Sequence, residues 1–324
     1  MRIFITGGTG SLGKALVRNL LDAGSERVCS YARCEVRAAN LESAYREHPN
    51  SGTLRVFVGD VRDCERLKRV MRGCDVVIHA AALKRVDSGS YHPDEMLKTN
   101  VNGTTNVIEA AAESGIKKLM LISSDKAAHP QNIYGATKLM AEYCAVASNS
   151  WTQARGLAVS VCRYGNVLGS RGSVLDIWRR QVSEGKPLQI TDASITRFWI
   201  TLQQAVTFVL DSIDRMAGGE IFLPILPSAR LLDLARAVAP EHPFEIVGLR
   251  PGGEKLHERL LADEEVWRAR RQPGRIIIAP AHNFWGGPEI EGDPLPAGFT
   301  YASDTNDWWL TPDEIRALLG QGGG

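Results

Sequence analysis

The sequence has no excess of charge of one sign. Its 324 residues include 38 Lys and Arg against 37 Asp and Glu, a formal net charge of +1. The lack of a basic surplus argues against nucleic acid as a partner, and the lack of an acidic tail argues against disorder. A chain of this length can bury a large core, so we expect one large domain and a smaller lobe.

The sequence also lacks closely paired cysteines and long apolar runs. Its six cysteines form no CxxC pair and no zinc-type spacing, so we expect reduced thiols and no metal site. No apolar stretch approaches the roughly 20 residues that span a bilayer. Strand-like residues begin at Arg2 and leave no room for a signal peptide. These absences predict a cytoplasmic protein with no membrane partner.

The first half alternates short apolar runs with amphipathic stretches. Leu12, Leu16 and Leu20 recur at helical spacing, and Gly24 is placed to end that helix. This alternation predicts an α/β fold, with a Rossmann-type doubly wound parallel sheet covered by helices on both faces. The expected strands are residues 2–6, 27–31, 54–58, 76–79, 118–122 and 157–162.

The second half is less regular, because Pro and Gly interrupt it near residues 185–187, 224–227 and 251–253. We expect it to form a substrate-binding lobe over the carboxyl ends of the strands, where such sheets bind ligands. The expected division is a Rossmann domain (1–168, with a return segment near 198–224), a smaller C-terminal substrate-binding lobe (169–197 and 225–319) and a flexible tail (320–324).

A glycine-rich turn, TGGTGSLG at residues 6–13, follows the first expected strand and opens the first expected helix. Glycine permits the tight turn and lets backbone N–H groups approach a pyrophosphate at the helix N-terminus. In this strand–turn–helix context the pattern predicts dinucleotide binding rather than a structural turn alone. The residues expected to contact the cofactor are Gly7, Thr9, Gly10, Ser11, Leu12 and Gly13.

The tip of the second expected strand bears on the choice between NADP and NAD. NAD sites usually carry an acid there for the ribose hydroxyls. Here Arg33 and Arg37 follow Ala32 and are suited to bind a 2′-phosphate, which favours NADP. Glu35 could instead reach the ribose, and the two arginines could simply be solvated at a helix start, so NAD stays possible.

The ends of the third and fourth expected strands complete the predicted cofactor site. Asp60 and Val61 are placed to meet the adenine. Ala80 and Ala81 belong to a small-residue loop that can lie flat against the cofactor. His79, just before them, is interpreted as a packed core histidine rather than a catalyst.

Tyr134 and Lys138 are four residues apart and therefore share one face of a helix. A free tyrosine with a pKa near 10 is a poor base at neutral pH. Lys138 and a positive nicotinamide would favour the phenolate, so that Tyr134 could take a proton from a substrate hydroxyl during oxidation. A solvated surface pair is the alternative.

Asp125 and Lys126 place an acid and an amine in one dipeptide after the fifth expected strand. Elimination of water beside a keto group needs a base for the C–H and an acid for the departing hydroxyl, and this pair could supply both. Burial against the cofactor would favour a neutral lysine and a protonated aspartate. A salt bridge that caps the strand end is the alternative.

Together these motifs resemble the extended short-chain dehydrogenase/reductases. Within that superfamily the chain resembles the inverting UDP-N-acetylglucosamine 4,6-dehydratases, which start pseudaminic acid biosynthesis. The resemblance covers about residues 1–261. Its motifs are GGTGSLGK, GDVRD, HAAALKRV, SSDKAAHPQNIYGATKL, RYGNVLGSRGSV, TRFWITL, GGEIFLP and RPGGEKLHE.

The resemblance implies a reaction and its catalytic residues. A UDP-sugar would be oxidised at C4, lose water across C5 and C6, and receive the hydride back at C6 with inversion at C5. Lys126 would be the C5 base and Asp125 the acid for the leaving hydroxyl. Ser124 and Ser123 would hydrogen-bond the substrate or the nicotinamide side.

The resemblance also implies further contacts. Homo-oligomers, as dimers or hexamers, are expected.

One glycine more than the usual motif precedes Glu254 and could displace it. Arg197 would either support lobe closure or form an internal salt bridge. The residues expected to bind substrate are Lys84, Asn166, Val174, Thr191, Arg250 and Glu254, and those expected near the cofactor are Val167, Gly169, Ser170 and Arg171.

Other functions on the same scaffold remain open. A nucleotide-sugar 4-epimerase needs only Tyr134, Lys138 and rotation of the keto sugar, so the Asp125–Lys126 pair argues against it. A non-inverting 4,6-dehydratase on the same scaffold is a further alternative. A non-catalytic NADP-binding protein is disfavoured because Tyr134 and Lys138 are both present.

Overall fold

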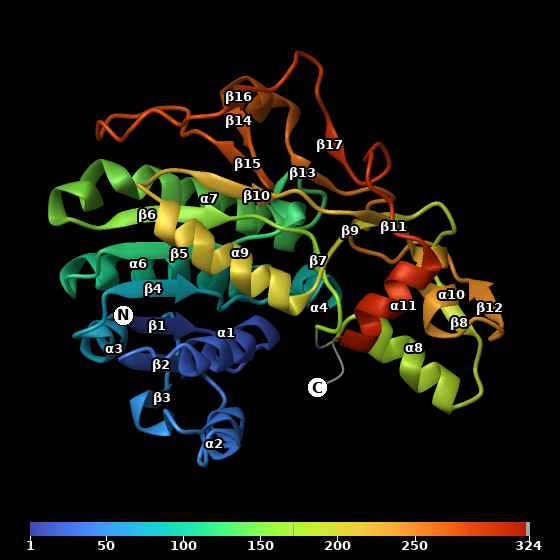
Figure 1. Ribbon diagram of the computed structural model, residues 1–324, viewed down its shortest axis with the longest axis horizontal. Helices are drawn as coiled ribbons and strands as arrows, with labels where there is room; N and C mark the ends of the chain where they lie inside the picture. The colour runs from blue at the N-terminus through green and yellow to red at the C-terminus, as the bar shows by residue number, and fades with distance from the viewer. Residues whose placement is uncertain (171, 322–324) are drawn as a thin grey trace.

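A large sheet forms the centre of the computed structural model, which describes residues 1–170 and 172–321 (Figure 1). Seven parallel strands lie in the order β3-β2-β1-β4-β5-β6-β10. The order reverses between β1 and β4, which is where doubly wound sheets bind ligands. The predicted parallel α/β fold is confirmed, and the six expected strands are found to within one residue. The seven strands are β1 (Arg2–Thr6), β2 (Arg27–Ala32), β3 (Leu54–Val58), β4 (Val76–His79), β5 (Lys118–Ile122), β6 (Ala158–Cys162) and β10 (Ile221–Pro224).

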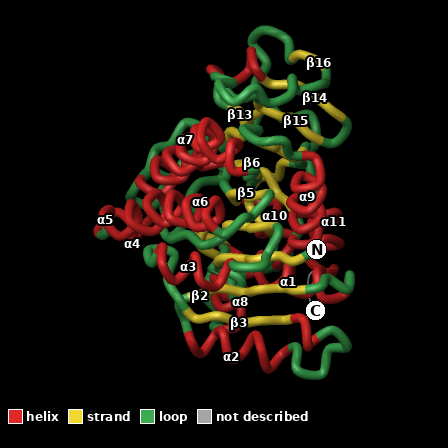
Figure 2. Tube along the Cα trace, turned by 90° about the vertical axis from the view of Figure 1, so that its left-hand side faces the viewer, coloured by secondary structure: helices red, strands yellow, loops and turns green. Residues whose placement is uncertain are grey.

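Helices cover both faces of this sheet (Figure 2). The helices α1 (Ser11–Asp22) and α9 (Leu202–Arg215) pack together on one face. The other face carries α3 (Cys64–Met71), α6 (Gly103–Glu113) and α7 (Ile133–Thr152), packed side by side. Successive residues of β1 are consequently buried, as a two-faced parallel sheet requires.

The sheet continues with antiparallel strands beyond β10. The strand β15 (Arg275–Ile278) pairs with β10, followed by β14 (Ala269–Gln272) and β16 (Asp293–Pro294). The expected domain division had placed these segments in the smaller lobe. They join the main sheet because β10 offers an edge on which the apolar run Ile276, Ile277 and Ile278 becomes buried.

A second apolar cluster lies in the smaller lobe, seen on the right of Figure 1. Its centre contains the fully buried Trp178, Ile195 and Leu234. The lobe's elements are α8 (Val174–Ser183), β8 (Leu188–Ile190), α10 (Leu231–Val238), β12 (Phe244–Ile246) and α11 (Pro312–Gln321). Two smaller sheets are formed by β11 (Ser228–Arg230), β9 (Thr196–Ile200) and β7 (Asn166–Val167), and by β13 (Arg259–Leu261) and β17 (Tyr301–Ala302).

The remaining helical elements are short. They are α2 (Glu35–Ala44), α4 (Val86–Tyr91), α5 (Pro93–Met96), the π-helical turn Leu97–Asn102 and 3₁₀ turns at Ser51–Thr53, Asp125–Ala127, Gln153–Arg155 and Asp263–Arg268. In the part of the chain that the structure describes, none of the helices combines the length and apolar character needed to cross a membrane. The expected tail began at residue 320, but α11 continues through Gln321, and residues 322–324 lie outside the described ranges.

Candidate functional site

The glycine-rich turn follows β1 and leads directly into α1. Gly7 has a φ of 71°, and a Cβ there would lie 2.8 Å from the Ala81 nitrogen, so only glycine fits. The Gly7 N–H donates to the Tyr31 carbonyl at 2.8 Å, which fixes the turn against β2. Gly10 precedes α1 and has no side chain to cap it, which suits a helix N-terminus that receives a pyrophosphate.

His79 ends β4 inside the core, as predicted, with 1% of its surface exposed. Its Nδ1 lies 2.6 Å from Thr6 Oγ1 and its Nε2 lies 3.1 Å from Thr104 Oγ1. Burial, helped by Lys138, lowers the pKa of His79 to about 3, so the ring stays neutral. The adjacent Ala81 N–H donates to Thr6 Oγ1, which holds the small-residue loop beside the glycine turn.

The tips of β2 and β3 bring Arg33 close to Asp60. Arg33 Nη1 lies 3.8 Å from Asp60 Oδ2, and Arg62 Nη2 lies 2.8 Å from the same oxygen. Burial raises the pKa of Asp60, but the hydrogen bonds from Arg62 and the charge of Arg33 lower it below the ordinary value. Half of the Arg33 side chain is exposed.

Three residues near this pair differ in their exposure to solvent. Arg37 is exposed on α2, while Val61 is buried and packs under Gly103. Glu35 is the first residue of α2 and is exposed. An arginine pair and a carboxylate therefore both border the place expected for the adenosine ribose.

The dipeptide Asp125–Lys126 lies in a 3₁₀ turn directly beyond β5. The Asp125 N–H donates to the Tyr164 carbonyl at 3.0 Å, which fixes the turn to the chain after β6. Lys126 Nζ lies 3.0 Å from Asp125 Oδ1, and Ser124 Oγ donates to the same oxygen at 2.8 Å. The Asp125 side chain is fully buried and that of Lys126 is 25% exposed, so one end of the pair is open for a ligand.

The expected direction of the pKa shift is found for only one member of the pair. Burial raises the pKa of the Asp125 carboxyl, as predicted. Burial also lowers the pKa of Lys126, but the carboxylates of Asp125 and Glu258 raise it by more, so the net shift is upward. The expectation of a neutral Lys126 is therefore wrong for the unliganded protein. Asp125 and a second carboxylate that is absent from the local sequence, Glu258, together outweigh the effect of burial.

Tyr134 and Lys138 lie one helical turn apart at the start of α7, which Asn132 caps by accepting from the Gly135 N–H at 2.9 Å. Burial raises the pKa of Tyr134, while Lys126 and a hydrogen bond from Ser124 lower it in part. Burial also lowers the pKa of Lys138 to about 8, with Glu142 opposing it. Lys138 Nζ donates to the Ile122 carbonyl at 2.6 Å.

The hydrogen-bond partner of Ser123 differs from the expected one, which was the substrate or the nicotinamide side. Its hydroxyl donates to Glu142 Oε1 at 2.5 Å, and 4% of the residue is exposed. Ser124 instead contacts Asp125 and Tyr134. Of the two serines, Ser124 is the one whose hydroxyl lies among the candidate catalytic groups.

Arg250 and Glu254, both expected to bind substrate, form an ion pair with each other. Arg250 Nη2 lies 2.5 Å from Glu254 Oε1, and the Arg250 N–H donates to Glu254 Oε2 at 3.0 Å. The glycine that precedes Glu254 packs against the catalytic side, because a Cβ at Gly253 would overlap the Gln131 carbonyl. The extra glycine therefore lets the lobe segment approach the chain between Lys126 and Tyr134.

Arg197 forms internal contacts, one of the two alternatives left by the sequence. Its guanidinium donates to the carbonyls of Thr196, Lys255 and Leu256 and lies 3.6 Å from Glu254 Oε1. Its side chain is 8% exposed. Arg197 thus fixes the lobe segment rather than facing an open site.

The other residues expected to bind ligand come from several elements. Asn166 Oδ1 lies 3.4 Å from Lys126 Nζ, so Asn166 belongs to the catalytic cluster. Val174 begins α8, Lys84 is exposed before α4, and Thr191 follows β8 with its hydroxyl buried and without a hydrogen-bond partner among the described residues. Val167 lies in β7, and Gly169 and Ser170 follow it. Arg171 falls outside the described residues.

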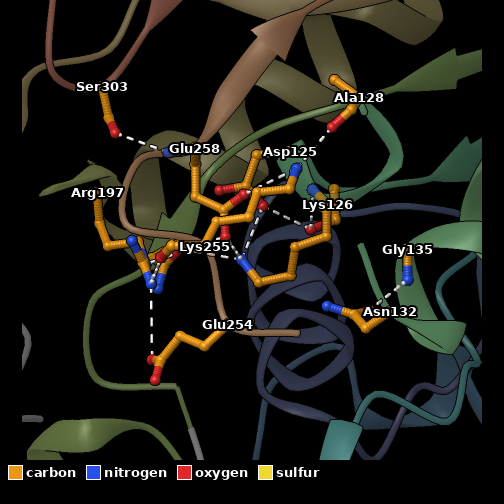
Figure 3. A network of polar contacts seen from close by, with 12 residues as sticks. Asp125, Lys126, Ala128, Asn132, Gly135, Arg197, Glu254, Lys255, Glu258 and Ser303 are labelled. Carbon is orange, nitrogen blue, oxygen red and sulfur yellow. Dashed lines mark hydrogen bonds and ion pairs between the residues drawn. The ribbon is translucent and has the colours of Figure 1, made fainter. Parts of the chain in front are cut away.

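Sequence reasoning missed two residues of this site, Lys255 and Glu258. Glu258 Oε1 lies 3.3 Å from Lys126 Nζ, and Lys255 Nζ donates to the Ala128 carbonyl at 2.7 Å (Figure 3). Both belong to the RPGGEKLHE motif, but no local pattern indicates that its charges meet those of residues 125 and 126. The motif's unusual density of charge was the only available signal.

The arrangement therefore places a phenol, an amine and a partly open acid–amine pair beside a dinucleotide-type turn. Such a set can move protons at two neighbouring carbons of one bound molecule. In residues 1–170 and 172–321 no three His, Cys, Asp or Glu side chains are grouped to hold a metal ion.

Comparison with known proteins identifies a family, curated relatives and a solved structure that are similar to this chain. The family described as polysaccharide biosynthesis protein matches residues 3–280. An inverting UDP-N-acetylglucosamine 4,6-dehydratase from Campylobacter jejuni is 41% identical over 327 residues, covering 98% of this chain and 96% of the relative. A UDP-glucose 4-epimerase from Rickettsia rickettsii is 35% identical over 323 residues, covering 98% and 94%. The X-ray structure of Pen from Bacillus thuringiensis shares a TM-score of 0.90 at 32% identity, covering 99% of this chain and 98% of that one.

Proposed function

Since the chain belongs to the polysaccharide biosynthesis protein family and, within it, to the inverting UDP-N-acetylglucosamine 4,6-dehydratases, we propose that it dehydrates UDP-N-acetylglucosamine. The product would be UDP-2-acetamido-2,6-dideoxy-L-arabino-hexos-4-ulose. The observation that carries the proposal is the buried Asp125 beside the partly exposed Lys126, within the same cluster as Tyr134.

A nicotinamide dinucleotide fits the turn after β1, because Gly10 leaves the N-terminus of α1 without a side-chain cap, where a pyrophosphate can bind. Gly7, Thr9, Gly10, Ser11, Leu12 and Gly13 would hold its pyrophosphate. When bound, the cofactor would accept hydride from C4 of the sugar and return it to C6.

The chain's own residues supply the proton transfers. Tyr134 takes the proton of the 4-hydroxyl, supported by Lys138 and Ser124. Lys126 then removes the C5 proton, and Asp125 protonates the departing 6-hydroxyl so that it leaves as water. Return of a proton to the opposite face of C5 inverts that centre.

The substrate would lie between the sheet and the smaller lobe. Arg250 suits the UDP pyrophosphate and Glu254 a ribose or uracil donor, once their mutual ion pair opens. Lys84, Asn166, Val174 and Thr191 would complete the substrate contacts. Val167, Gly169, Ser170 and Arg171 would border the cofactor.

Dehydration with inversion can be tested directly with UDP-N-acetylglucosamine in D2O, followed by NMR of the sugar. We expect a 4-keto-6-deoxy product with deuterium at C5 and the L-arabino configuration. An unchanged 6-hydroxymethyl group would refute dehydration. A D-xylo product would keep dehydration and refute inversion.

The first alternative is a 4-epimerase, favoured by the relationship to the Rickettsia enzymes. An epimerase would invert C4, retain the 6-hydroxyl and leave C5 undeuterated in the same NMR experiment. A non-catalytic dinucleotide-binding protein would leave the sugar unchanged.

We propose NADP rather than NAD as the cofactor, because Arg33 and Arg37 border the expected ribose position. Replacing both by alanine should weaken NADPH binding about 10- to 100-fold, the effect of losing charge-assisted hydrogen bonds. NADH binding should change little, as measured by fluorescence titration. Arg27→Ala, at the opposite end of β2, is the matched control. Equal losses for both cofactors would contradict the assignment.

We also propose a homo-oligomer, either a dimer or a hexamer, in the cytoplasm. One face of α7 exposes Ala136, Met140, Tyr143, Ala147 and Trp151 at helical spacing, an apolar stripe suited to a second copy of the chain. All six cysteines are free, which suits a reducing compartment.

A further inference from the structure

Glu258 reaches the candidate catalytic pair from a distant part of the chain (Figure 3). Its Oε1 lies 3.3 Å from Lys126 Nζ. The same nitrogen lies 3.0 Å from Asp125 Oδ1. The Glu258 side chain is only 3% exposed. Lys126 therefore lies between two buried carboxylates.

These two carboxylates have different surroundings. In the described part of the chain, one oxygen of each carboxylate, Asp125 Oδ2 and Glu258 Oε2, is buried without a hydrogen-bond partner, but Asp125 has a single cation within ion-pair distance, Lys126. Glu258 has three, because Lys255 Nζ lies 3.4 Å from Oε2 and Arg197 Nε lies 4.0 Å from Oε1. Three nearby cations stabilise an ionised Glu258, whereas a single one does little to offset the complete burial of Asp125.

The direction of the pKa shifts agrees with this geometry. Burial raises the pKa of Asp125, and the charge of Glu258 adds to that shift. Burial acts the same way on Glu258, but Lys126, Arg197 and Lys255 together bring its pKa below the ordinary value. Two carboxylates whose pKa values are driven apart can take separate roles.

The backbone around Glu258 is firmly held. The Glu258 N–H donates to Ser303 Oγ at 2.9 Å. Lys255, on the same segment, donates to the Ala128 carbonyl at 2.7 Å, just beyond the catalytic turn. The segment therefore contacts residues 125–128 at two points and fixes the Glu258 carboxylate relative to Lys126.

We propose that Glu258 is a positioning residue for dehydration. It stays ionised as the counter-ion of Lys126, so that Asp125 is the carboxylate that accepts and donates the proton. This role rests on the proposed dehydratase function. Before elimination, one ammonium proton of Lys126 passes to Asp125 Oδ1, which makes the amine neutral and the acid protonated. The amine then takes the C5 proton and Asp125 gives its proton to the leaving hydroxyl, which restores the initial ion pair.

The charged and titratable groups around Glu258 determine the sign of the expected effect. Those groups are Lys126 and Asp125 in the catalytic turn, Arg197 in β9, Lys255 on the same segment and Tyr134 in α7. Replacing Glu258 by glutamine removes a negative charge, so protons bind less tightly to both Lys126 and Asp125.

The decisive experiment is an NMR titration of the unliganded protein labelled with ¹³C at lysine Cε. The Lys126 signal is assigned by its absence in Lys126→Ala. In Glu258→Gln, the Lys126 midpoint should fall by about 1–3 pH units relative to wild type, the usual effect of losing an opposite charge at this distance. Glu258→Asp retains the charge and should stay close to wild type.

An unchanged Lys126 midpoint in Glu258→Gln would overturn the proposal. Because the titration needs no substrate, it remains decisive even if the protein proves not to be a dehydratase. With UDP-N-acetylglucosamine, both limbs of the kcat–pH profile should move to lower pH in Glu258→Gln while KM stays constant. A lower kcat at every pH with unmoved limbs would indicate only a structural role, and would contradict the proposal. Glu184→Gln, an exposed carboxylate on the lobe, is the control for both measurements.

Discussion

Replacement of Lys126 by alanine is expected to lower the rate of 4-keto sugar formation by about 10²- to 10⁴-fold, the usual contribution of a positioned proton-transfer group. Lys126 is the amine within the acid–amine pair, and a quarter of its side chain is open to a ligand. The nicotinamide site is built on other elements, so NADPH affinity should persist. Initial rates with UDP-N-acetylglucosamine and a fluorescence titration with NADPH check the two parts.

The control for this result is Lys186→Ala, which removes an exposed lysine of the lobe. It should leave both rate and affinity unchanged. Deuterium exchange at C5 of the 4-keto product is a second readout, because it depends on the C5 base alone. Normal turnover or normal exchange in Lys126→Ala would remove Lys126 from its assigned role.

Of the substitutions proposed for this protein, Arg163→Ala should lower the free energy of unfolding the most. Arg163 is fully buried just after β6 and donates to both carboxylate oxygens of Glu142 and of Glu265. Burial lowers the pKa of its guanidinium, but these two carboxylates raise it by more. Removing the cation leaves two buried carboxylates uncompensated, which costs about 3–5 kcal/mol of unfolding free energy.

Urea denaturation monitored by circular dichroism measures this change. Arg18→Ala is a matched control, because Arg18 pairs with Asp22 at 3.8 Å on the surface of α1 with both side chains mostly exposed. The control should change the free energy of unfolding by about 0–1 kcal/mol. If Arg163→Ala lowers the free energy of unfolding by no more than this control does, the buried ion pairs of Arg163 are not what holds α7 to the Asp263–Arg268 turn.

Local patterns were sufficient to predict much of the fold. The strands of residues 2–6 and 118–122 are short apolar runs followed by polar or glycine residues, and their bounds in the structure agree. The helical spacing of Tyr134 and Lys138 predicted their shared face in the same way. In each case the residues that determine the structure are neighbours in the chain.

Long-range contacts could not be predicted in this way. The segment of residues 269–278 gives no local sign of which sheet it joins, and the open edge of β10 decides this. Ser123 could not be assigned either, because its partner Glu142 lies on a different element.

The sequence by itself determined the parallel sheet, the glycine turn and the acid–amine pair, because periodicity and turn chemistry act between near neighbours. Only the tertiary structure decided the charge on Lys126. Burial lowers the pKa of that amine, whereas the carboxylates of Asp125 and of Glu258, which the fold brings to within 3.3 Å, raise it by more. Electrostatic energy depends on distance in space, and no local pattern contains that distance.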